Sequence, residues 1–170
     1  MRVDGGTTTT VRLSLLRAPH YPDPDADQGT HTFRYAFVPG ARIADAIREG
    51  YLINLPERRT RGAAAASVPA LVTVDNQAVV TEAVKLADDQ SGDVVVRLYE
   101  SQGGRANTRL TADFTVGMAT ATDLLDRPLP GTGPLPVTDG STVELSFRPF
   151  EIRTLRLTRA EGTIASGDGG

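Results

Sequence analysis

The side chains best suited to chemistry gather between residues 17 and 37. Both histidines of the sequence, His20 and His31, lie in this stretch, and aspartates alternate between them at Asp23, Asp25 and Asp27. Imidazole and carboxylate groups bind divalent metals and transfer protons, and aspartate also closes turns. The spacing therefore allows three interpretations, which are a metal site, a catalytic site and a turn between two strands.

A calcium loop of the EF-hand type can be tested position by position. Its alternating ligands would begin at Asp23, but the loop also needs glycine at the sixth position and a bidentate glutamate at the twelfth. The sequence has Gln28 and Arg34 at those two positions. The pattern therefore excludes an EF-hand. A zinc site built on the two histidines needs a third ligand, such as Asp23 or Asp25, and stays an alternative.

The same stretch also has the composition of a turn. It contains three prolines and Gly29, which favour turns and loops over regular structure. In this interpretation the aspartates cap turns and His31 is an ordinary strand residue. A polar loop of thirteen residues, from 18 to 30, is also long enough to serve a neighbouring surface. Both interpretations remain open.

The elements around this loop are predicted from hydrophobic periodicity. Alternating apolar residues predict strands over 11–17 and 31–38, and apolar residues four apart predict a helix over 43–54. Small and charged residues between two prolines predict a linker over 56–69. Two strands and a helix cannot enclose a core. We therefore expect 1–58 to pack on the second half, or to belong to a larger domain of which this chain is a fragment.

The second half contains short strands separated by turn residues and no helical pattern. This is typical of an antiparallel β-sandwich, with Gly103 and Gly104 predicted to form a hairpin connection. The expected fold is therefore mainly β, with one short helix, and the tail 159–170 is expected to be disordered. Strands are predicted over 70–74, 79–87, 94–100, 109–116, 119–125, 142–147 and 150–157. The predicted core includes Val96, Leu98, Phe114, Leu145 and Phe147.

Composition excludes several classes of function. The chain has no cysteine, which excludes disulfides and thiolate metal sites and fits a cytoplasmic protein. A net charge of −3 with scattered arginines gives no basis for nucleic-acid binding. The start of the chain lacks the apolar region of a secretory signal, and no apolar run is long enough to span a membrane. No local Ser/His/Asp or Cys/His signature is present.

Three stretches together resemble one family. They are "LSLLRAPHYPDPDADQGTHTFRYAF", "VVTEAVKLADDQSGDVVVRLYES" and "LSFRPFEIRTLRL". In order and spacing they are similar to the C-terminal region of family 38 glycoside hydrolases, the retaining α-mannosidases, and most of all to the bacterial and cytosolic branch. The resemblance covers about residues 9–158.

The resemblance implies that this chain forms the non-catalytic β region of a longer enzyme. Residues 1–58 would end a central β domain, and 59–158 would form the C-terminal sandwich. The nucleophile and a divalent metal, usually zinc, belong to an N-terminal barrel, so no catalytic or metal-binding residue is expected in this chain. The loop resembles one that reaches the catalytic pocket in related enzymes. The residues expected to line the rim of the mannose pocket are Asp25, Asp27, Gln28, Gly29 and His31.

Two other functions compete with this one. A carbohydrate-binding module would stack sugars on exposed aromatic rings. The chain has no tryptophan and only 5% aromatic residues, most of them at positions predicted to face inward, which disfavours such a module. An unrelated immunoglobulin-like interaction module is disfavoured by the helix at 43–54 and by the three matched stretches. The expected partners are therefore the catalytic domain in cis and an α-mannoside, with no nucleic acid and no membrane.

Overall fold

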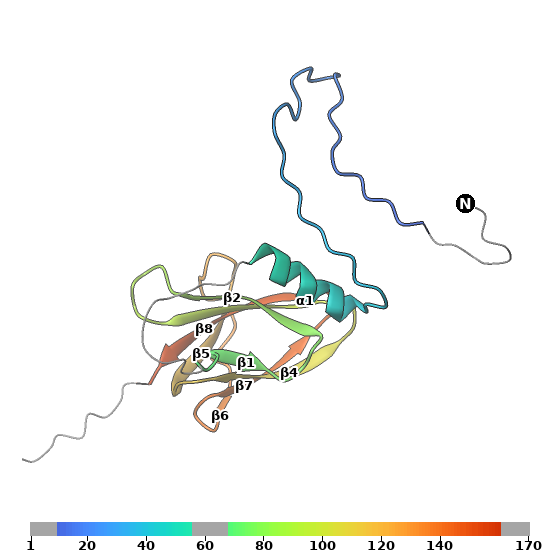
Figure 1. The fold of residues 1–170 in the computed structure, drawn as a ribbon. Coiled ribbons are helices and arrows are strands. Elements are labelled where there is room, and N and C mark those ends of the chain that lie inside the picture. Colours follow the sequence, from blue (N-terminus) through green and yellow to red (C-terminus); the bar gives the residue numbers. More distant parts are fainter. Residues whose placement is uncertain (1–9, 56–67, 161–170) are drawn as a thin grey trace, which may run out of the picture.

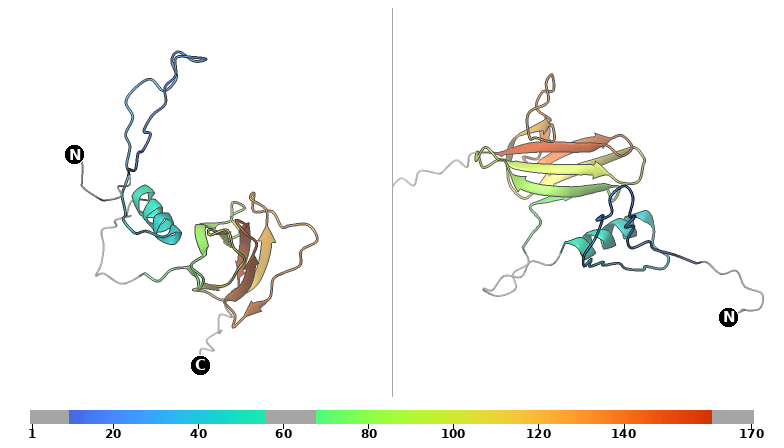
Figure 2. Two further views of the ribbon diagram at one scale, coloured as in Figure 1. Left: turned by 90° about the vertical axis from the view of Figure 1, so that its right-hand side faces the viewer. Right: turned by 90° about the horizontal axis from the view of Figure 1, so that it is seen from above.

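The computed structural model describes residues 10–55 and 68–160, which form one helix and eight strands. The strands make two antiparallel four-stranded sheets, in the orders β1-β4-β7-β6 and β2-β3-β8-β5, that face each other as a sandwich (Figures 1 and 2). This confirms the predicted fold class. The elements are α1 (Ile43–Asn54), β1 (Val72–Val74), β2 (Val79–Leu86), β3 (Val94–Glu100), β4 (Ala106–Ala112), β5 (Val116–Thr122), β6 (Val137–Thr138), β7 (Thr142–Phe147) and β8 (Ile152–Arg159).

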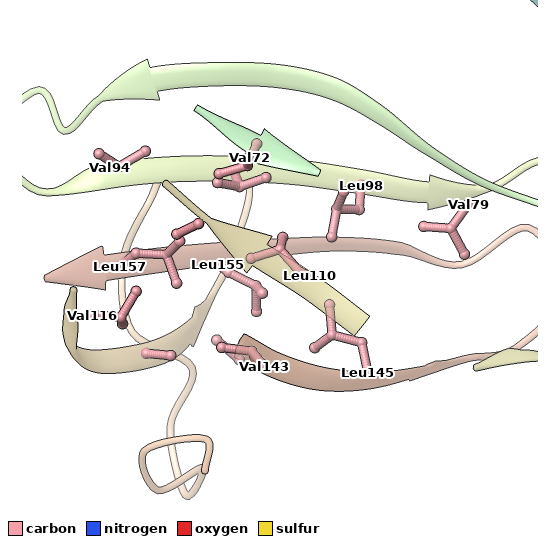
Figure 3. Close-up of a cluster of buried hydrophobic side chains, with 14 of the residues drawn as sticks. Val72, Val79, Val94, Leu98, Leu110, Val116, Val143, Leu145, Leu155 and Leu157 are labelled. Carbon is pink, nitrogen blue, oxygen red and sulfur yellow. The ribbon is translucent and has the colours of Figure 1, made fainter. Parts of the chain in front are cut away.

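The core lies between the two sheets and follows from alternation along the strands. In β4 every second residue is buried, and Leu110 pairs with the equally buried Val143 of β7. In the facing sheet, Leu98 of β3 and Leu155 of β8 are fully buried (Figure 3). Each such side chain contributes roughly 1.5–3 kcal/mol through burial. Four predicted core residues are confirmed as buried, namely Val96, Leu98, Leu145 and Phe147.

The chain changes sheets at a point where the sequence predicted a hairpin. β3 belongs to one sheet and β4 to the other, so the segment containing Gly103 crosses between sheets. Gly103 adopts a φ of +77°, a conformation that glycine accepts without steric cost. The hairpin prediction is therefore wrong. A Gly-Gly turn serves a crossing between sheets as well as it serves a hairpin.

The predicted strand 109–116 is also interrupted. β4 ends at Ala112 and β5 begins at Val116, in the opposite sheet. Phe114 lies in the connection and is only partly buried, packed against the edge of the core. Phe114 was predicted to be largely buried within a strand. The structure instead places it, partly buried, in the connection, because the inward face of β4 ends two residues before it.

Residues 10–41, here called the arm, do not form the two predicted strands. They contain turns but no strand, and they extend away from the sandwich (Figure 1). A β-strand needs a hydrogen-bonded neighbour and cover for its apolar face. The described residues supply neither, so the alternating pattern is present without a sheet.

The helix α1 forms over the predicted residues and lies on the β2 side of the sandwich (Figures 1 and 2). Its first turn is capped by Asp45, whose carboxylate accepts a hydrogen bond of 3.0 Å from the backbone N–H of Arg42. None of its residues is fully buried. The helix meets the sandwich through a 3.3 Å contact between the hydroxyls of Tyr51 and Tyr99.

Within the described ranges, no helix has the length and apolar character needed to cross a bilayer. Most of the predicted linker, at residues 56–67, and most of the predicted tail, at residues 161–170, lie outside the described residues.

Candidate functional site

The predicted rim residues come together in one compact turn of the arm. The backbone N–H of Asp25 donates a 3.0 Å hydrogen bond to the Asp23 carboxylate, which is an Asx turn. The Gln28 amide donates back to the Pro24 carbonyl at 3.2 Å. Asp23 and Pro24 thus help to position two of the predicted residues, Asp25 and Gln28.

His31 also contacts this turn. Its Nε2 lies 2.8 Å from the backbone carbonyl oxygen of Asp27, and its ring stacks on Phe33 with ring centroids 6.1 Å apart. Asp27 and Gly29 have positive φ values of 54° and 123°. Aspartate and glycine are among the residues that tolerate such conformations. The five predicted residues therefore share one locally determined turn.

This turn has free hydrogen-bonding capacity. All five predicted rim residues are exposed. Within the part of the chain that the structure describes, no hydrogen bond engages the side-chain oxygens of Asp25 or Asp27. Carboxylates in this state accept hydrogen bonds from hydroxyl groups of a ligand.

The zinc alternative gains no support from this geometry. Among residues 10–55 and 68–160, no three His, Cys, Asp or Glu side chains gather in a way that could hold a metal ion. His31 already has one ring nitrogen at hydrogen-bonding distance from a backbone carbonyl.

A buried carboxylate that the sequence did not reveal lies at the end of β3. Glu100 is 1% exposed, and it accepts hydrogen bonds from the backbone N–H groups of Gln102 and Gly103, both at 2.8 Å, and of Phe150, at 3.0 Å. The Phe150 bond is the largest cause that lowers the pKa of Glu100, with those to Gln102, Gly103 and Gly104 adding to it. Glu100 therefore stays ionised and joins the crossing after β3 to the turn before β8.

Charged side chains also line the outer face of the sheet β2-β3-β8-β5. Arg156 donates to Asp93 at 2.6 Å and to Asp89 at 2.7 Å, which fixes the β2–β3 turn. Lys85, the only lysine, pairs with the nearly buried Asp126, and that hydrogen bond is the main reason its pKa is raised. The three aspartates named here each have a cationic partner, so this network is structural.

A hollow of about 690 Å³ lies on the outer face of the other sheet. Arg109 and Asp75 form a 2.9 Å ion pair in it, and hydrogen bonds from the backbone and side chain of Arg109 lower the pKa of Asp75 to about 2. An acid that is already ionised and paired is a poor proton-transfer group at neutral pH. The hollow is therefore a poor candidate for an acid–base site.

Comparison with known proteins places these features in a family context. Residues 78–155 match the family model of the glycosyl hydrolases family 38 C-terminal beta sandwich domain. The chain is 38% identical over 154 residues to alpha-mannosidase 2C1 of Mus musculus and to that of Homo sapiens, over 86% of this chain in each case. It is 27% identical over 173 residues to an alpha-mannosidase of Saccharomyces cerevisiae, over 86% of this chain and 16% of the relative.

The alignments with these relatives extend beyond the residues matched by the family model. The alignment with the mouse protein covers 86% of this chain, so it necessarily includes much of the segment before residue 78. The likeness therefore extends beyond the sandwich. At the same time, the chain spans about 15% of the length of the mouse and human relatives.

Proposed function

Because residues 78–155 belong to the C-terminal β-sandwich domains of family 38 glycosyl hydrolases, we propose that the chain is the non-catalytic C-terminal β region of a retaining α-mannosidase. The parent enzyme would hydrolyse terminal α-mannosides of oligosaccharide or N-glycan type in the cytoplasm. In this proposal, residues 1–58 end a central β domain and 59–158 form the C-terminal sandwich. The turn with Asp25, Asp27, Gln28, Gly29 and His31 lies at the rim of the sugar pocket.

The observation that carries this proposal is the uncovered apolar surface of the arm. Large apolar side chains along it are exposed, including Val11 at 73%, Tyr35 at 70% and Phe37 at 74%. Large apolar side chains left exposed in this number along one segment are typical of an interface. The catalytic domain of the same polypeptide would cover this surface. In the relatives, that domain would lie in the part of the sequence that this chain does not span.

Docking of the arm would place its turn against that domain. The turn lies within an arm whose two flanking segments are both apolar, so covering these segments brings Asp25 and Asp27 close to the covering surface. Retaining chemistry needs a nucleophile and an acid/base carboxyl about 5–5.5 Å apart. We assign that pair, and a divalent metal such as zinc, to the catalytic domain. The rim residues would orient sugar hydroxyls.

The purified chain alone should show no α-mannosidase activity, with or without added zinc. The physical reason is that hydrolysis requires the carboxyl pair assigned to the catalytic domain. The measurement is release of the aryl group from an aryl α-mannoside, compared with a mock purification. Turnover above the mock level would contradict the assignment of the chemistry to another part of the enzyme.

In the full-length enzyme, Asp27→Asn and Gln28→Ala should each lower kcat/KM by about tenfold. The first replaces a charged acceptor of sugar hydroxyls with a neutral amide, and the second removes a polar side chain. Asparagine is chosen because it tolerates the positive φ of Asp27. The matched control is Asp139→Asn, an exposed aspartate with a φ of 50° in the turn between β6 and β7. Unchanged kcat/KM in both rim variants, with normal folding, would contradict a role of this turn at the sugar pocket.

A further inference from the structure

Phe150 is an exposed aromatic ring held in a fixed position. It is 70% exposed and has a φ of 57°, a conformation that costs energy for a bulky residue. Its backbone N–H donates to the buried carboxylate of Glu100. Its ring rests directly on Gly103, where an added Cβ would lie 2.7 Å from the ring Cζ. The hydrogen bond to Glu100 and the contact with Gly103 therefore fix the position of this exposed ring.

The ring forms one wall of a cleft of about 390 Å³, within the roughly 300–1,000 Å³ range of small-molecule sites. Tyr51 of α1, Tyr99 of β3 and Ile152 of β8 also line it. The two tyrosine hydroxyls lie 3.3 Å apart, and this hydrogen bond is the main reason the pKa of Tyr51 is raised to about 12. Tyr51 is therefore a neutral hydroxyl at physiological pH, able to donate and accept hydrogen bonds.

A β-bulge adds a carboxylate to the same cleft. In the pairing of β2 with β3, Thr81 opposes Leu98 and Ala83 opposes Arg97, so Glu82 is an extra residue in the strand. Bulges redirect a side chain relative to the regular alternation. The exposed Glu82 lines the cleft and is close enough to Tyr51 to contribute to the raised pKa of that phenol.

An aromatic face beside a carboxylate and hydroxyls matches the two sides of a pyranose ring. The C–H face of the sugar packs on an aromatic ring, while its hydroxyls bond to carboxylates and phenols. We propose that the cleft lined by Phe150, Tyr51 and Glu82 is a binding site for a pyranose ring. The choice of an α-mannoside as its ligand rests on the proposed function.

The site also corrects an expectation from the sequence. Most aromatic residues were predicted to face inward, which disfavoured sugar binding. Five of the nine are exposed in the structure, and Phe147 is the one ring counted in the buried core. Four of these five rings lie in the arm, which the proposed function covers with the catalytic domain, so the objection is lifted only for the surface around Phe150.

The test is an NMR titration of the purified chain with methyl α-mannoside. We expect saturable amide shifts centred on residues 150–152 and Tyr99, with a Kd on the order of 1–10 mM. Phe150→Ala should weaken binding at least tenfold. Phe37→Ala, which removes an equally exposed ring from the arm, should leave binding unchanged. Mannitol, an acyclic polyol without a rigid C–H face, should give no saturable shifts.

A second variant keeps the test decisive if Phe150→Ala does not fold. Glu82→Gln changes an exposed side chain and should weaken binding severalfold without altering the melting temperature. The absence of saturable shifts in the wild-type chain would overturn the proposal, and so would equal weakening by Phe37→Ala or equal shifts with mannitol. These readouts involve no catalysis, so their failure is distinguishable from failure of the rim proposal, which is judged by kcat/KM.

Discussion

Phe147→Ala should lower the free energy of unfolding by about 3–5 kcal/mol, as truncation of a core aromatic does. Phe147 is 3% exposed at the end of β7, where it opposes Ala106 of β4 within the shared core. Small neighbours of this kind cannot expand to fill the cavity that the missing ring leaves. The measurement is equilibrium unfolding in denaturant, with the midpoint and the slope both recorded.

Phe114→Ala is the matched control for this prediction. Phe114 is only partly buried, and the guanidinium of Arg159 covers its ring at 4.8 Å from the centroid. We expect a loss of about 1–2 kcal/mol, because solvent and neighbouring side chains can fill part of the space. Equal losses in the two variants would show that the core extends around Phe114. An unchanged midpoint for Phe147→Ala would contradict the placement of β7 in the sandwich.

Glu100→Gln should lower the melting temperature at pH 7 by about 10 °C, a large effect for a domain of this size. The carboxylate accepts hydrogen bonds from backbone N–H groups on two separate segments, at Gln102, Gly103 and Phe150. A glutamine amide offers one acceptor oxygen, and its NH₂ group would face the remaining backbone donors. Buried donors left without an acceptor are destabilising.

The same residue should make stability depend on pH in a defined direction. The pKa of Glu100 is lowered in the folded state, so its contribution is present above the unfolded pKa of about 4.3. That contribution is lost as pH falls through the folded pKa. Between pH 5 and pH 3, the wild-type melting temperature should therefore fall more steeply than that of Glu100→Gln. Parallel curves would contradict the assignment.

Glu144→Gln provides the control for both measurements. Glu144 is exposed on the outer face of β7, and the substitution changes the net charge as Glu100→Gln does. We expect its melting temperature to stay within about 2 °C of the wild type, since surface substitutions have small effects. A drop as large as that of Glu100→Gln would point to net charge as the cause.

The sequence correctly predicted the helix and several strands that are indicated by a pattern within their own segment. The helix at 43–54 was predicted because apolar residues four apart and Asp45 in the first turn are signals within the segment itself. β7 formed because strict alternation from Thr142 to Phe147 matches one buried and one exposed face. The five residues predicted to line the rim share one turn for the same reason, since that turn is made by contacts within four residues. Their place at a sugar pocket stays a prediction.

The errors arose where the outcome depends on a distant partner. Alternation in the arm predicted strands, but a strand forms only beside another one, and none of the described residues pairs with it. Gly103 was assigned to a hairpin because turn chemistry does not reveal which sheet the chain enters next. Glu100 was missed because one of its partners, Phe150, is fifty residues away. The sequence signal that could have indicated it is an acidic residue at the end of a predicted strand, followed closely by Gly103 and Gly104.

The position of β8 in its sheet sets the order in which the sheet can be completed during protein synthesis. β8 lies between β3 and β5, yet both of those strands precede it in the chain and so leave the ribosome first. Until residues 152–159 emerge, β3 and β5 each expose an edge with unpaired backbone groups, which favours association with other chains. A message truncated before Ile152 would therefore yield an aggregating product, and a chaperone that shields strand edges would act on this protein during that interval.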